Sequence, residues 1–146
     1  MRKAIFTAEQ IAPCGMNCGV CSGYLALSHA VPQKRGFISH CAGCRARKKR
    51  CAYLKGQCQL LAGGRVSFCF ECSKFPCKHL EHLDNRYQTR YGMSPIQNLE
   101  EIRDKGMRRF VENQTERFLC PKCRTDAVCV HNKKCYRCDA VSSWRD

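Results

Sequence analysis

Hydrophobic residues recur at intervals of three or four between residues 78 and 118, a stretch without cysteine. This spacing places them on one face of a helix, and it breaks at Gly92 and Gly106, which are typical helix ends. The sequence therefore predicts three short amphipathic helices, the first with Pro76 in its first turn and the second starting at Ser94. Their apolar faces carry Leu80, Leu83, Tyr87 and Tyr91; Ile96, Leu99 and Ile102; and Met107, Phe110, Val111 and Phe118.

Two cysteine pairs with C-x2-C spacing flank an eleven-residue gap within residues 119–138. An apolar, β-favouring run over 127–130, in which Val128 and Val130 alternate with Cys129 and His131, is followed by turn-forming residues, a pattern that favours a β-hairpin. Two thiolates spaced in this way can reach one ion from a tight turn, and four of them satisfy a tetrahedral zinc site. The sequence therefore predicts a C-terminal zinc ribbon with the ligands Cys120, Cys123, Cys135 and Cys138.

Other residues of the predicted ribbon have less specific expected roles. Cys129 fits a small buried hydrophobic residue better than a fifth ligand, and His131 fits a residue of the hairpin turn. Zinc knuckles often carry glycine after the second cysteine, where φ is positive. Arg124 and Asp139 occupy these positions here. Because arginine adopts a positive φ less readily than aspartate does, we expect a distorted first knuckle.

The composition indicates that something other than an apolar interior holds the chain together. Leu, Ile, Val and Phe make up about 19% of the 146 residues, and the formal net charge is +14. Sequences with so few large apolar residues and so high a net charge are typically disordered. Since 15 residues are cysteine, we expect the cysteines to supply the missing stabilisation. No apolar run approaches the length needed to span a bilayer.

Metal binding explains the cysteines better than disulfides do. The number of cysteines is odd. Four pairs have C-x2-C spacing, and the cluster at 14, 18 and 21 contains it once more. The first residues of the sequence lack the apolar run of a signal peptide. We therefore expect a cytoplasmic protein, in which structural disulfides are rare. Thiolates suit both zinc and iron–sulfur clusters. Because the bacterial ferredoxin spacing is absent, zinc is the favoured metal and an iron–sulfur cluster is the alternative.

The cysteines that precede residue 78 predict an N-terminal metal-binding module. Two four-thiolate sites would use eight of the ten, which with the C-terminal site gives about three zinc ions per chain. Sequential pairing would join Cys14 and either Cys18 or Cys21 to the pair at 41 and 44, whereas a cross-braced arrangement would interleave the clusters. Spacing alone leaves both open. The predicted ligands are Cys14, Cys18, Cys21, Cys41, Cys44, Cys51, Cys58, Cys69, Cys72 and Cys77.

Three of these cysteine motifs resemble those of a known family. The motifs are Cys14-Gly-Met-Asn-Cys18-Gly-Val-Cys21-Ser-Gly-Tyr24, Cys41-Ala-Gly-Cys44-Arg45 and Phe68-Cys69-Phe-Glu-Cys72-Ser-Lys-Phe-Pro-Cys77. They are similar to those of a small cysteine-rich bacterial and archaeal family of unknown function. Its longer members share features of the segment from Ser94 onward and of the C-terminal cysteines. The resemblance implies metal binding through these cysteines and no established activity.

A run of basic residues follows Cys44 and leads to Cys51. Such a loop could lie along a phosphate backbone. Metal binding leaves the chain basic, because three four-thiolate zinc sites lower the net charge only to about +8. We expect RNA or another single-stranded nucleic acid, or else a protein, as the partner, and the alternative is a solvated loop. The candidate contacts are Arg45, Arg47, Lys48, Lys49 and Arg50.

Known catalytic motifs are absent from the sequence. It has no nucleophile elbow, no paired-histidine metalloprotease helix and no phosphate-binding glycine loop. The weak candidate is Cys77 at a predicted helix start, where Lys78 and His79 would favour its thiolate; it supports the alternative of a thiol enzyme or redox sensor. Ordinary surface carboxylates are expected at Glu81, Asp84, Glu100 and Glu101.

Together these features predict a small α+β protein that is stabilised by metal. We expect a cysteine-rich module over residues 1–77, a helical segment over 78–118 that packs on it, and the zinc ribbon with a polar tail over 119–146. The expected function is that of a non-catalytic basic binding module for nucleic acid or protein.

Overall fold

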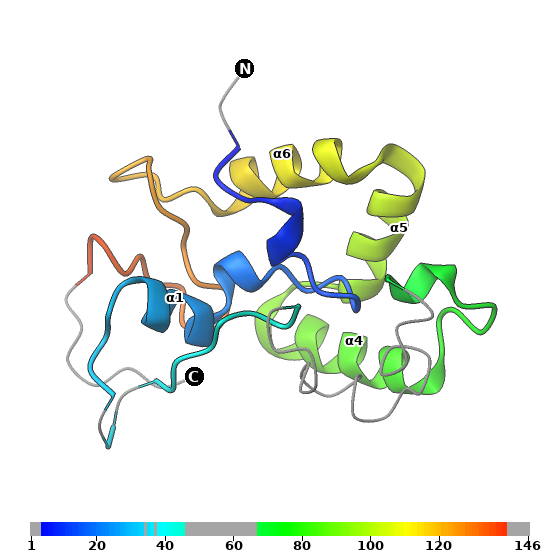
Figure 1. The fold of residues 1–146 in the computed structure, drawn as a ribbon, viewed down its shortest axis with the longest axis horizontal. Coiled ribbons are helices and arrows are strands. Elements are labelled where there is room, and N and C mark those ends of the chain that lie inside the picture. Colours follow the sequence, from blue (N-terminus) through cyan, green and yellow to red (C-terminus); the bar gives the residue numbers. More distant parts are fainter. Residues whose placement is uncertain (1–3, 34, 37, 46–66, 140–146) are drawn as a thin grey trace.

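The computed structural model describes residues 4–33, 35–36, 38–45 and 67–139. This part of the chain is mostly helical (Figure 1). None of its helices is long and apolar enough to cross a membrane. The 3-10 helices are η1 (Ala8–Gln10), η2 (Cys18–Val20) and η3 (Cys69–Glu71), and the α-helices are α1 (Ser22–Ser28), α4 (Lys78–Tyr91), α5 (Pro95–Lys105) and α6 (Met107–Phe118).

Local chemistry sets the boundaries of α4, α5 and α6. Gly92 ends α4 in the left-handed conformation, with φ of 66°. The Ser94 hydroxyl accepts a hydrogen bond from a backbone N–H in the first turn of α5, and Gly106, with φ of 90°, separates α5 from α6. The three helices predicted from hydrophobic spacing are therefore confirmed. Pro76 is the exception, since it precedes the N-cap residue Cys77 and lies outside the first turn.

The N-terminal segment, residues 4–21, lies between the long helices. In Figure 1, α6 runs along one side of the molecule and α4 along the other, while α5 joins them and packs against both. The Ile5 N–H donates to Thr115 Oγ1 of α6 at 3.0 Å. Farther along, Asn17 Nδ2 donates to Gln114 Oε1 on the same helix at 3.2 Å. These contacts hold the segment against the inner face of α6.

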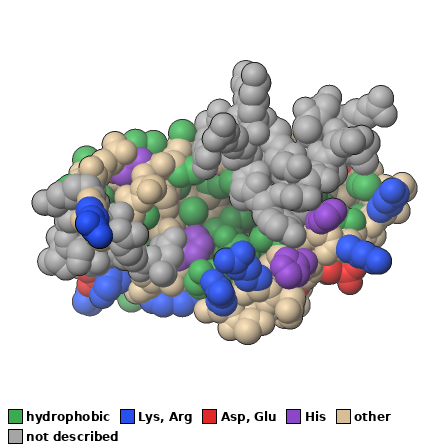
Figure 2. Space-filling view, turned by 90° about the horizontal axis from the view of Figure 1, so that it is seen from below, with side chains coloured by type: hydrophobic (Ala, Val, Ile, Leu, Met, Phe, Trp, Pro, Cys, Tyr) green, Lys and Arg blue, Asp and Glu red, His purple; other side chains and the backbone are tan. Residues whose placement is uncertain are grey.

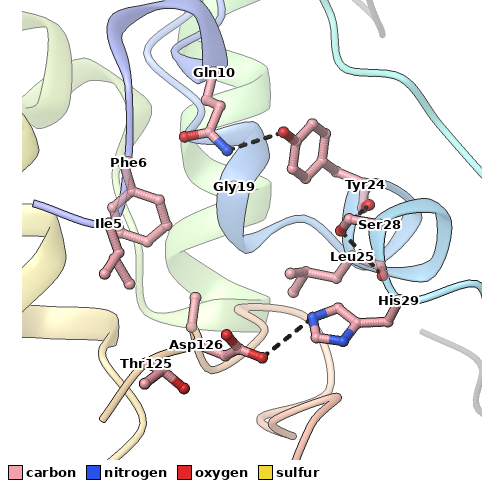
Figure 3. A pocket seen from close by; sticks show the side chains of 11 residues that line it. Ile5, Phe6, Gln10, Gly19, Tyr24, Leu25, Ser28, His29, Thr125 and Asp126 are labelled. Atoms are coloured by element: carbon pink, nitrogen blue, oxygen red, sulfur yellow. Dashed lines mark hydrogen bonds and ion pairs between the residues drawn. The ribbon is translucent and has the colours of Figure 1, made fainter.

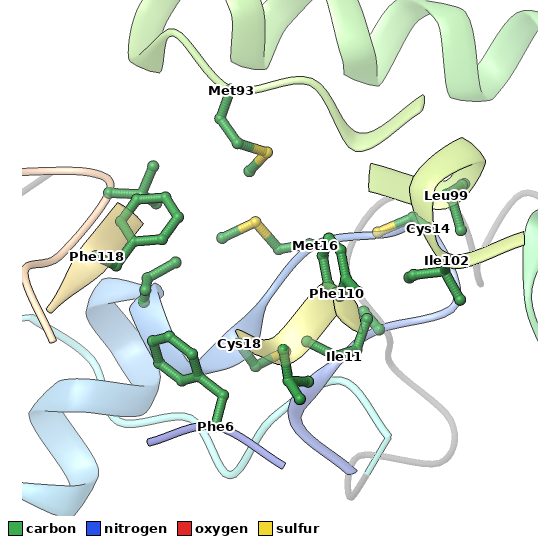
Figure 4. Close-up of a cluster of buried hydrophobic side chains, with 14 of the residues drawn as sticks. Phe6, Ile11, Cys14, Met16, Cys18, Met93, Leu99, Ile102, Phe110 and Phe118 are labelled. Carbon is green, nitrogen blue, oxygen red and sulfur yellow. The ribbon is translucent and has the colours of Figure 1, made fainter. Parts of the chain in front are cut away.

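An apolar core fills the space where this segment meets the helices (Figure 4). Ile11 from the segment, Leu99 from α5 and Phe110 from α6 are all completely buried. The thiols of Cys14 and Cys18 belong to the same core. The expectation that the chain lacks an apolar interior is therefore wrong. Its large apolar residues are few, but they are concentrated on inward-facing positions, and buried area rather than overall composition determines hydrophobic stabilisation.

The predicted fold class, α+β with a C-terminal β-hairpin zinc ribbon, is also wrong. Over the described residues, strand pairing is limited to isolated antiparallel bridges. Two of these lie in the C-terminal region, one joining Leu119 to Ala127 and one joining Val128 to Cys135. The two bridges do not join into one ladder, because the neighbouring residues Ala127 and Val128 pair with different segments. Between Val128 and Cys135 the chain turns, and Lys133 in this turn has φ of 61°.

Residues 119–139, here called the cysteine module, are thus built from turns. A second, smaller core attaches this module to α1 and to the chain that follows it. Cys129 is completely buried in this core, beside Tyr136 from the module and Leu25 from α1. This confirms the prediction that Cys129 serves as a small buried residue.

Candidate metal centre

Two similar turns present the cysteines of the module. In the first turn the Arg124 N–H donates to the Cys120 carbonyl, and in the second the Asp139 N–H donates to the Cys135 carbonyl, both at 2.9 Å. Arg124 has φ of 56° and so takes the conformation for which glycine is common. The two turns close with the same hydrogen bond, and the distortion expected from arginine does not affect it. The Asp139 carboxylate also accepts from the Cys135 N–H at 2.8 Å.

The turns bring four sulfur atoms together. The Sγ atoms of Cys120 and Cys138 are 3.8 Å apart, and so are those of Cys123 and Cys135. All four lie within 4.8 Å of one another. Among the described residues, no other group of metal-ligating side chains is gathered so closely. Zinc–sulfur bonds of about 2.3 Å in a tetrahedron give sulfur–sulfur edges of about 3.8 Å. The donor set and its spacing therefore fit one tetrahedral ion.

Surrounding groups shift the pKa values of these thiols in opposite directions. Hydrogen bonds from Thr125, first from its hydroxyl and then from its N–H, lower the pKa of Cys123 to about 6. The Cys123 N–H lowers the pKa of Cys120. Desolvation raises the pKa of Cys135, and it raises that of Cys138 to about 12. A divalent cation allows all four thiolates to coexist, because its charge replaces the protons.

A histidine connects the cysteine module to α1 and α4. The His131 Nδ1 accepts a hydrogen bond from the Ser22 N–H at 3.1 Å, and its Nε2 lies 3.4 Å from the Tyr87 hydroxyl. The Tyr91 ring meets the imidazole edge-on, with the ring centroids 4.8 Å apart. An Nδ1 that accepts a hydrogen bond belongs to a neutral imidazole with its proton on Nε2. His131, which the sequence predicted as a turn residue, therefore also contacts α1 and α4.

A cavity of about 220 Å³ lies between the N-terminal segment, α1 and the cysteine module. His29, directly after α1, faces Asp126 of the module, with 3.6 Å between Nε2 and Oδ2 (Figure 3). On another side of the cavity Gln10 Nε2 donates to the Tyr24 hydroxyl at 3.0 Å. Asp126 also accepts the Cys120 N–H through its carbonyl at 2.8 Å. This contact makes the cavity wall continuous with the first cysteine turn.

The predicted N-terminal ligands come from three parts of the structure. Cys18 and Cys44 are in contact, since the Cys44 N–H donates to Cys18 Sγ at 3.3 Å. Cys69 starts η3, and its N–H donates to the Pro13 carbonyl, beside Cys14, at 2.9 Å. The weak nucleophile candidate, Cys77, is the N-cap residue of α4 and is half-buried. Cys51 and Cys58 lie outside the described residues.

The predicted nucleic-acid contacts can be followed only at Arg45, because residues 46–50 lie outside the described residues. The Arg45 Nε donates to the Ile11 carbonyl at 2.6 Å, and its guanidinium also donates to the Ser67 carbonyl at 3.1 Å. The guanidinium carbon is 4.5 Å from the centre of the Phe68 ring. Arg45 therefore holds the chain after Cys44 against the N-terminal segment.

One buried polar side chain was not predicted from the sequence. Asp84, expected on the helix surface, is buried. Its Oδ1 accepts hydrogen bonds from the Ser94 hydroxyl at 2.6 Å and from the Ile96 N–H at 2.9 Å. Its Oδ2 accepts from Gln88 Nε2. The available signal was its position next to Leu83, on the edge of the apolar stripe of α4.

The comparisons with known proteins locate the chain in a family without giving it an activity. Residues 10–82 match the family described as "Protein of unknown function (DUF3795)". This range includes the N-terminal cysteines and the start of α4, and it stops short of the cysteine module. No curated protein and no solved structure matches the chain. The matched range makes up half of the 146 residues, and the chain thus belongs to the DUF3795 family of proteins of unknown function.

Proposed function

We propose that the protein is a zinc-binding, non-catalytic module that docks on single-stranded nucleic acid. The observation that carries the zinc site is the approach of four sulfur atoms to within 4.8 Å of one another, with two separations of 3.8 Å. Soft thiolates in a tetrahedral set select zinc over hard cations such as magnesium or calcium. The proposed ligands are those of the cysteine module: Cys120, Cys123, Cys135 and Cys138.

The donor set supports a structural role for this ion. Catalytic zinc sites keep one coordination position for water or substrate, whereas structural sites fill all four with protein ligands. Four cysteines leave no open position. The ion would close the two turns onto each other and so replace the strand ladder that the region lacks. Zinc of this kind contributes directly to folding free energy.

Basic side chains around the site support docking on phosphates. Lys122, Arg124 and Arg137 are exposed and lie within two residues of a proposed ligand. Lys133 and Lys134 are exposed on the turn between the two cysteine pairs. In the view of Figure 2, basic side chains lie along the edges of the molecule and acidic ones show in few places. Such a distribution attracts polyanions and makes their binding sensitive to salt.

Single-stranded nucleic acid is the proposed partner because the sequence carries no recognition-helix signature for reading the major groove. The longest described helix, α4, has a buried apolar face against the core, and its ends are fixed by Cys77 and Gly92. Basic grooves that follow a flexible phosphate chain need no such helix.

The metal part of the proposal is tested by zinc content. Purified full-length protein is compared with the C120S/C138S variant by elemental analysis, and C129S serves as a control because Cys129 is buried in a separate core. We expect the double variant to lose one zinc ion per chain and C129S to lose none. Equal zinc content in all three proteins overturns the assignment.

The binding part is tested by fluorescence anisotropy with a labelled single-stranded RNA at several salt concentrations. The K122A/R124A/R137A variant is compared with R103A/K105A/R108A, which removes the same charge from exposed positions on α5 and α6. We expect the first variant to weaken binding at least tenfold and to reduce the salt slope by about 2, since each phosphate contact contributes about 0.7 for single strands. Equal losses in both variants would show that only net charge matters and contradict a local docking surface.

A further inference from the structure

A second pair of C-x2-C turns meets near the N-terminus, outside the cysteine module. The first turn runs from Cys18 to Cys21, and the second from Cys41 to Cys44. Cys18 starts η2, and the Cys21 N–H closes the turn on the Cys18 carbonyl at 3.0 Å. Cys21 is also the N-cap residue of α1. The first turn is therefore rigidly placed between two helical elements.

The two turns meet at both ends. At one end the Cys44 N–H donates to Cys18 Sγ at 3.3 Å, and the Cys18 thiol hydrogen-bonds to that of Cys44. At the other end the Cys41 N–H donates at 3.0 Å to the carbonyl of Gly23, two residues after Cys21. The first cysteine of one pair thus contacts the last cysteine of the other, and the backbone of the inner cysteine Cys41 meets the chain just after the other inner cysteine, Cys21.

This order of contacts repeats the one in the cysteine module. There the first cysteine, Cys120, approaches the last, Cys138, and the inner two, Cys123 and Cys135, approach each other. Two C-x2-C turns that meet in this antiparallel manner bring four cysteines into the same region of the structure. The N-terminal turns are separated by a different length of chain, so the agreement reflects packing in space and is independent of sequence spacing.

Glycines allow the close approach of the N-terminal turns. A Cβ on Gly23 would lie 3.0 Å from the Cys41 Cβ, which is closer than ordinary contact. Gly43, between Cys41 and Cys44, has φ of 102°, and its N–H donates to Cys41 Sγ at 3.5 Å. An N–H that points at sulfur favours the thiolate, which is the metal-binding form. A side chain at Gly23 would separate the cysteine pairs, whereas Gly43 is favoured by its positive φ.

Burial makes these thiols poor candidates for isolated ionised groups. Cys18 is only 4% exposed, and Cys21, Cys41 and Cys44 are half-buried. The nearby cation, Arg45, already donates its guanidinium hydrogen bonds to backbone carbonyls. An ion at the meeting point of the sulfurs supplies the positive charge that four thiolates require.

We propose that Cys18, Cys21, Cys41 and Cys44 form a second four-thiolate site, which takes a zinc ion. In the structure these sulfurs are less tightly gathered than those of the cysteine module. Rotation of cysteine side chains between staggered rotamers moves Sγ without moving the backbone, and the ion draws the four together. Cys14, which is buried in the same core as Cys18, lies outside both C-x2-C turns and is therefore left out of the proposed ligand set as a fifth thiol. This site does not depend on the one in the cysteine module.

Zinc content of full-length variants tests the assignment. We compare C18S/C44S and C41S with C14S, whose sulfur is close but unassigned, and with C120S/C138S, which reports on the other site. We expect C18S/C44S and C41S each to lose one zinc ion per chain and C14S to lose none. We also expect the combined C18S/C44S/C120S/C138S variant to lose two. Loss of one zinc in C14S, or unchanged zinc in C41S, overturns the ligand set.

Alkylation of the wild-type protein tests the site even if the variants fail to fold. Each cysteine is followed by mass spectrometry with and without a zinc chelator. We expect Cys41 and Cys44 to become reactive together when the chelator is added, as Cys123 and Cys138 do at the other site. Reactivity at Cys41 and Cys44 that is the same with and without chelator contradicts the proposal. So does visible absorption of an iron–sulfur cluster that disappears in C18S/C44S.

Discussion

The Nδ1 atom of His131 accepts a hydrogen bond at 3.1 Å from the N–H of Ser22, a residue 109 positions away in the sequence. Ser22 directly follows Cys21, and His131 lies four residues before Cys135. One imidazole therefore joins the chain at the N-terminal cysteine turns to the chain at the C-terminal ones. The Tyr87 and Tyr91 rings of α4 hold this imidazole in place.

Replacing His131 tests this connection. In H131A the N–H of the buried Ser22 loses this acceptor, and a buried donor left unsatisfied costs about 1–3 kcal/mol. We expect the free energy of unfolding, measured with urea on the zinc-loaded protein, to fall by that amount. In H131N the side-chain carbonyl can take the place of Nδ1, so a smaller loss is expected. Equal losses in both variants would assign the effect to aromatic packing alone.

Asp84 is the second long-range polar centre, and its removal should destabilise the α4–α5 corner. D84A removes the acceptor for the Ser94 hydroxyl and the Ile96 N–H. Because hydrogen bonds to a charged group and unsatisfied buried donors each contribute, we expect a loss of about 3 kcal/mol. S94A removes the helix cap and one hydrogen bond to the carboxylate but keeps the bond from the Ile96 N–H, so it should cost less, about 1–2 kcal/mol. Thermal unfolding measures both, and a loss in D84A no larger than in S94A contradicts the buried role of the carboxylate.

Two glycines with positive φ form a matched pair for a test of close packing. A Cβ on Gly15 would lie 2.4 Å from the Pro95 carbonyl oxygen, whereas a Cβ on Gly92 would meet nothing within 4 Å. G92A should therefore cost about 1 kcal/mol, the price of the left-handed conformation alone. G15A adds a backbone clash and should lower the unfolding temperature markedly more. Similar shifts in the two variants would mean that the N-terminal segment does not pack on α5 as described.

Removal of metal should affect the cysteine module more than the long helices. Phe110, Leu99 and Leu80 are completely buried in the apolar core, independently of any sulfur–metal bond. After treatment with a strong zinc chelator, we expect far-ultraviolet circular dichroism to retain most of its helical signal. Limited proteolysis should then cut within residues 119–139, where strand pairing is limited to isolated bridges. Loss of the helical signal together with the module would show that the core depends on metal.

Zinc affinity of the cysteine module should fall as the pH is lowered. The pKa of Cys123 is about 6, so this thiol is already ionised at pH 7, whereas the pKa of Cys138 is raised to about 12 and that of Cys135 is also raised. Zinc must displace protons from the last two, so lower pH opposes binding. Titrations of the C18S/C44S variant in buffers with different ionisation enthalpies count these protons. We expect at least two protons per ion at pH 7, from Cys135 and Cys138; none would contradict the raised pKa values.

The helices could be predicted because their signals are local. The apolar stripe of α4 ends at Gly92, and the Ser94 cap begins α5, within a few residues of the atoms they bond. The ligand set of the cysteine module follows from the same kind of short spacing. The core escaped prediction because residues 4–21 add Phe6, Ile11 and Val20 without a regular period. The side chain of Ile11 is buried among helices a hundred residues away, and periodicity does not report such contacts.

The errors of the sequence analysis share one physical cause. The apolar run over residues 127–130 suggested a hairpin. A stretch of four residues between the two cysteine turns is too short for a strand ladder, so the turns determine the course of the backbone. Asp84 was assigned to the surface because carboxylates usually are exposed. Its burial depends on Ser94 and Ile96, which follow in the next helix. In both cases a contact between separate elements overrides the local preference.

Cys138 differs from its three partners in the cysteine module because it alone of the four is exposed to solvent. A competing ligand, such as a chelator or an apo-metalloprotein that accepts zinc, must first reach one sulfur of an occupied tetrahedron. In the proposed zinc site, exchange would therefore begin at Cys138 and proceed inward, and the rate of metal transfer would depend on access to this one edge. An oxidant approaching from solvent meets the same sulfur first, so release of the ion and oxidative damage share a single entry point.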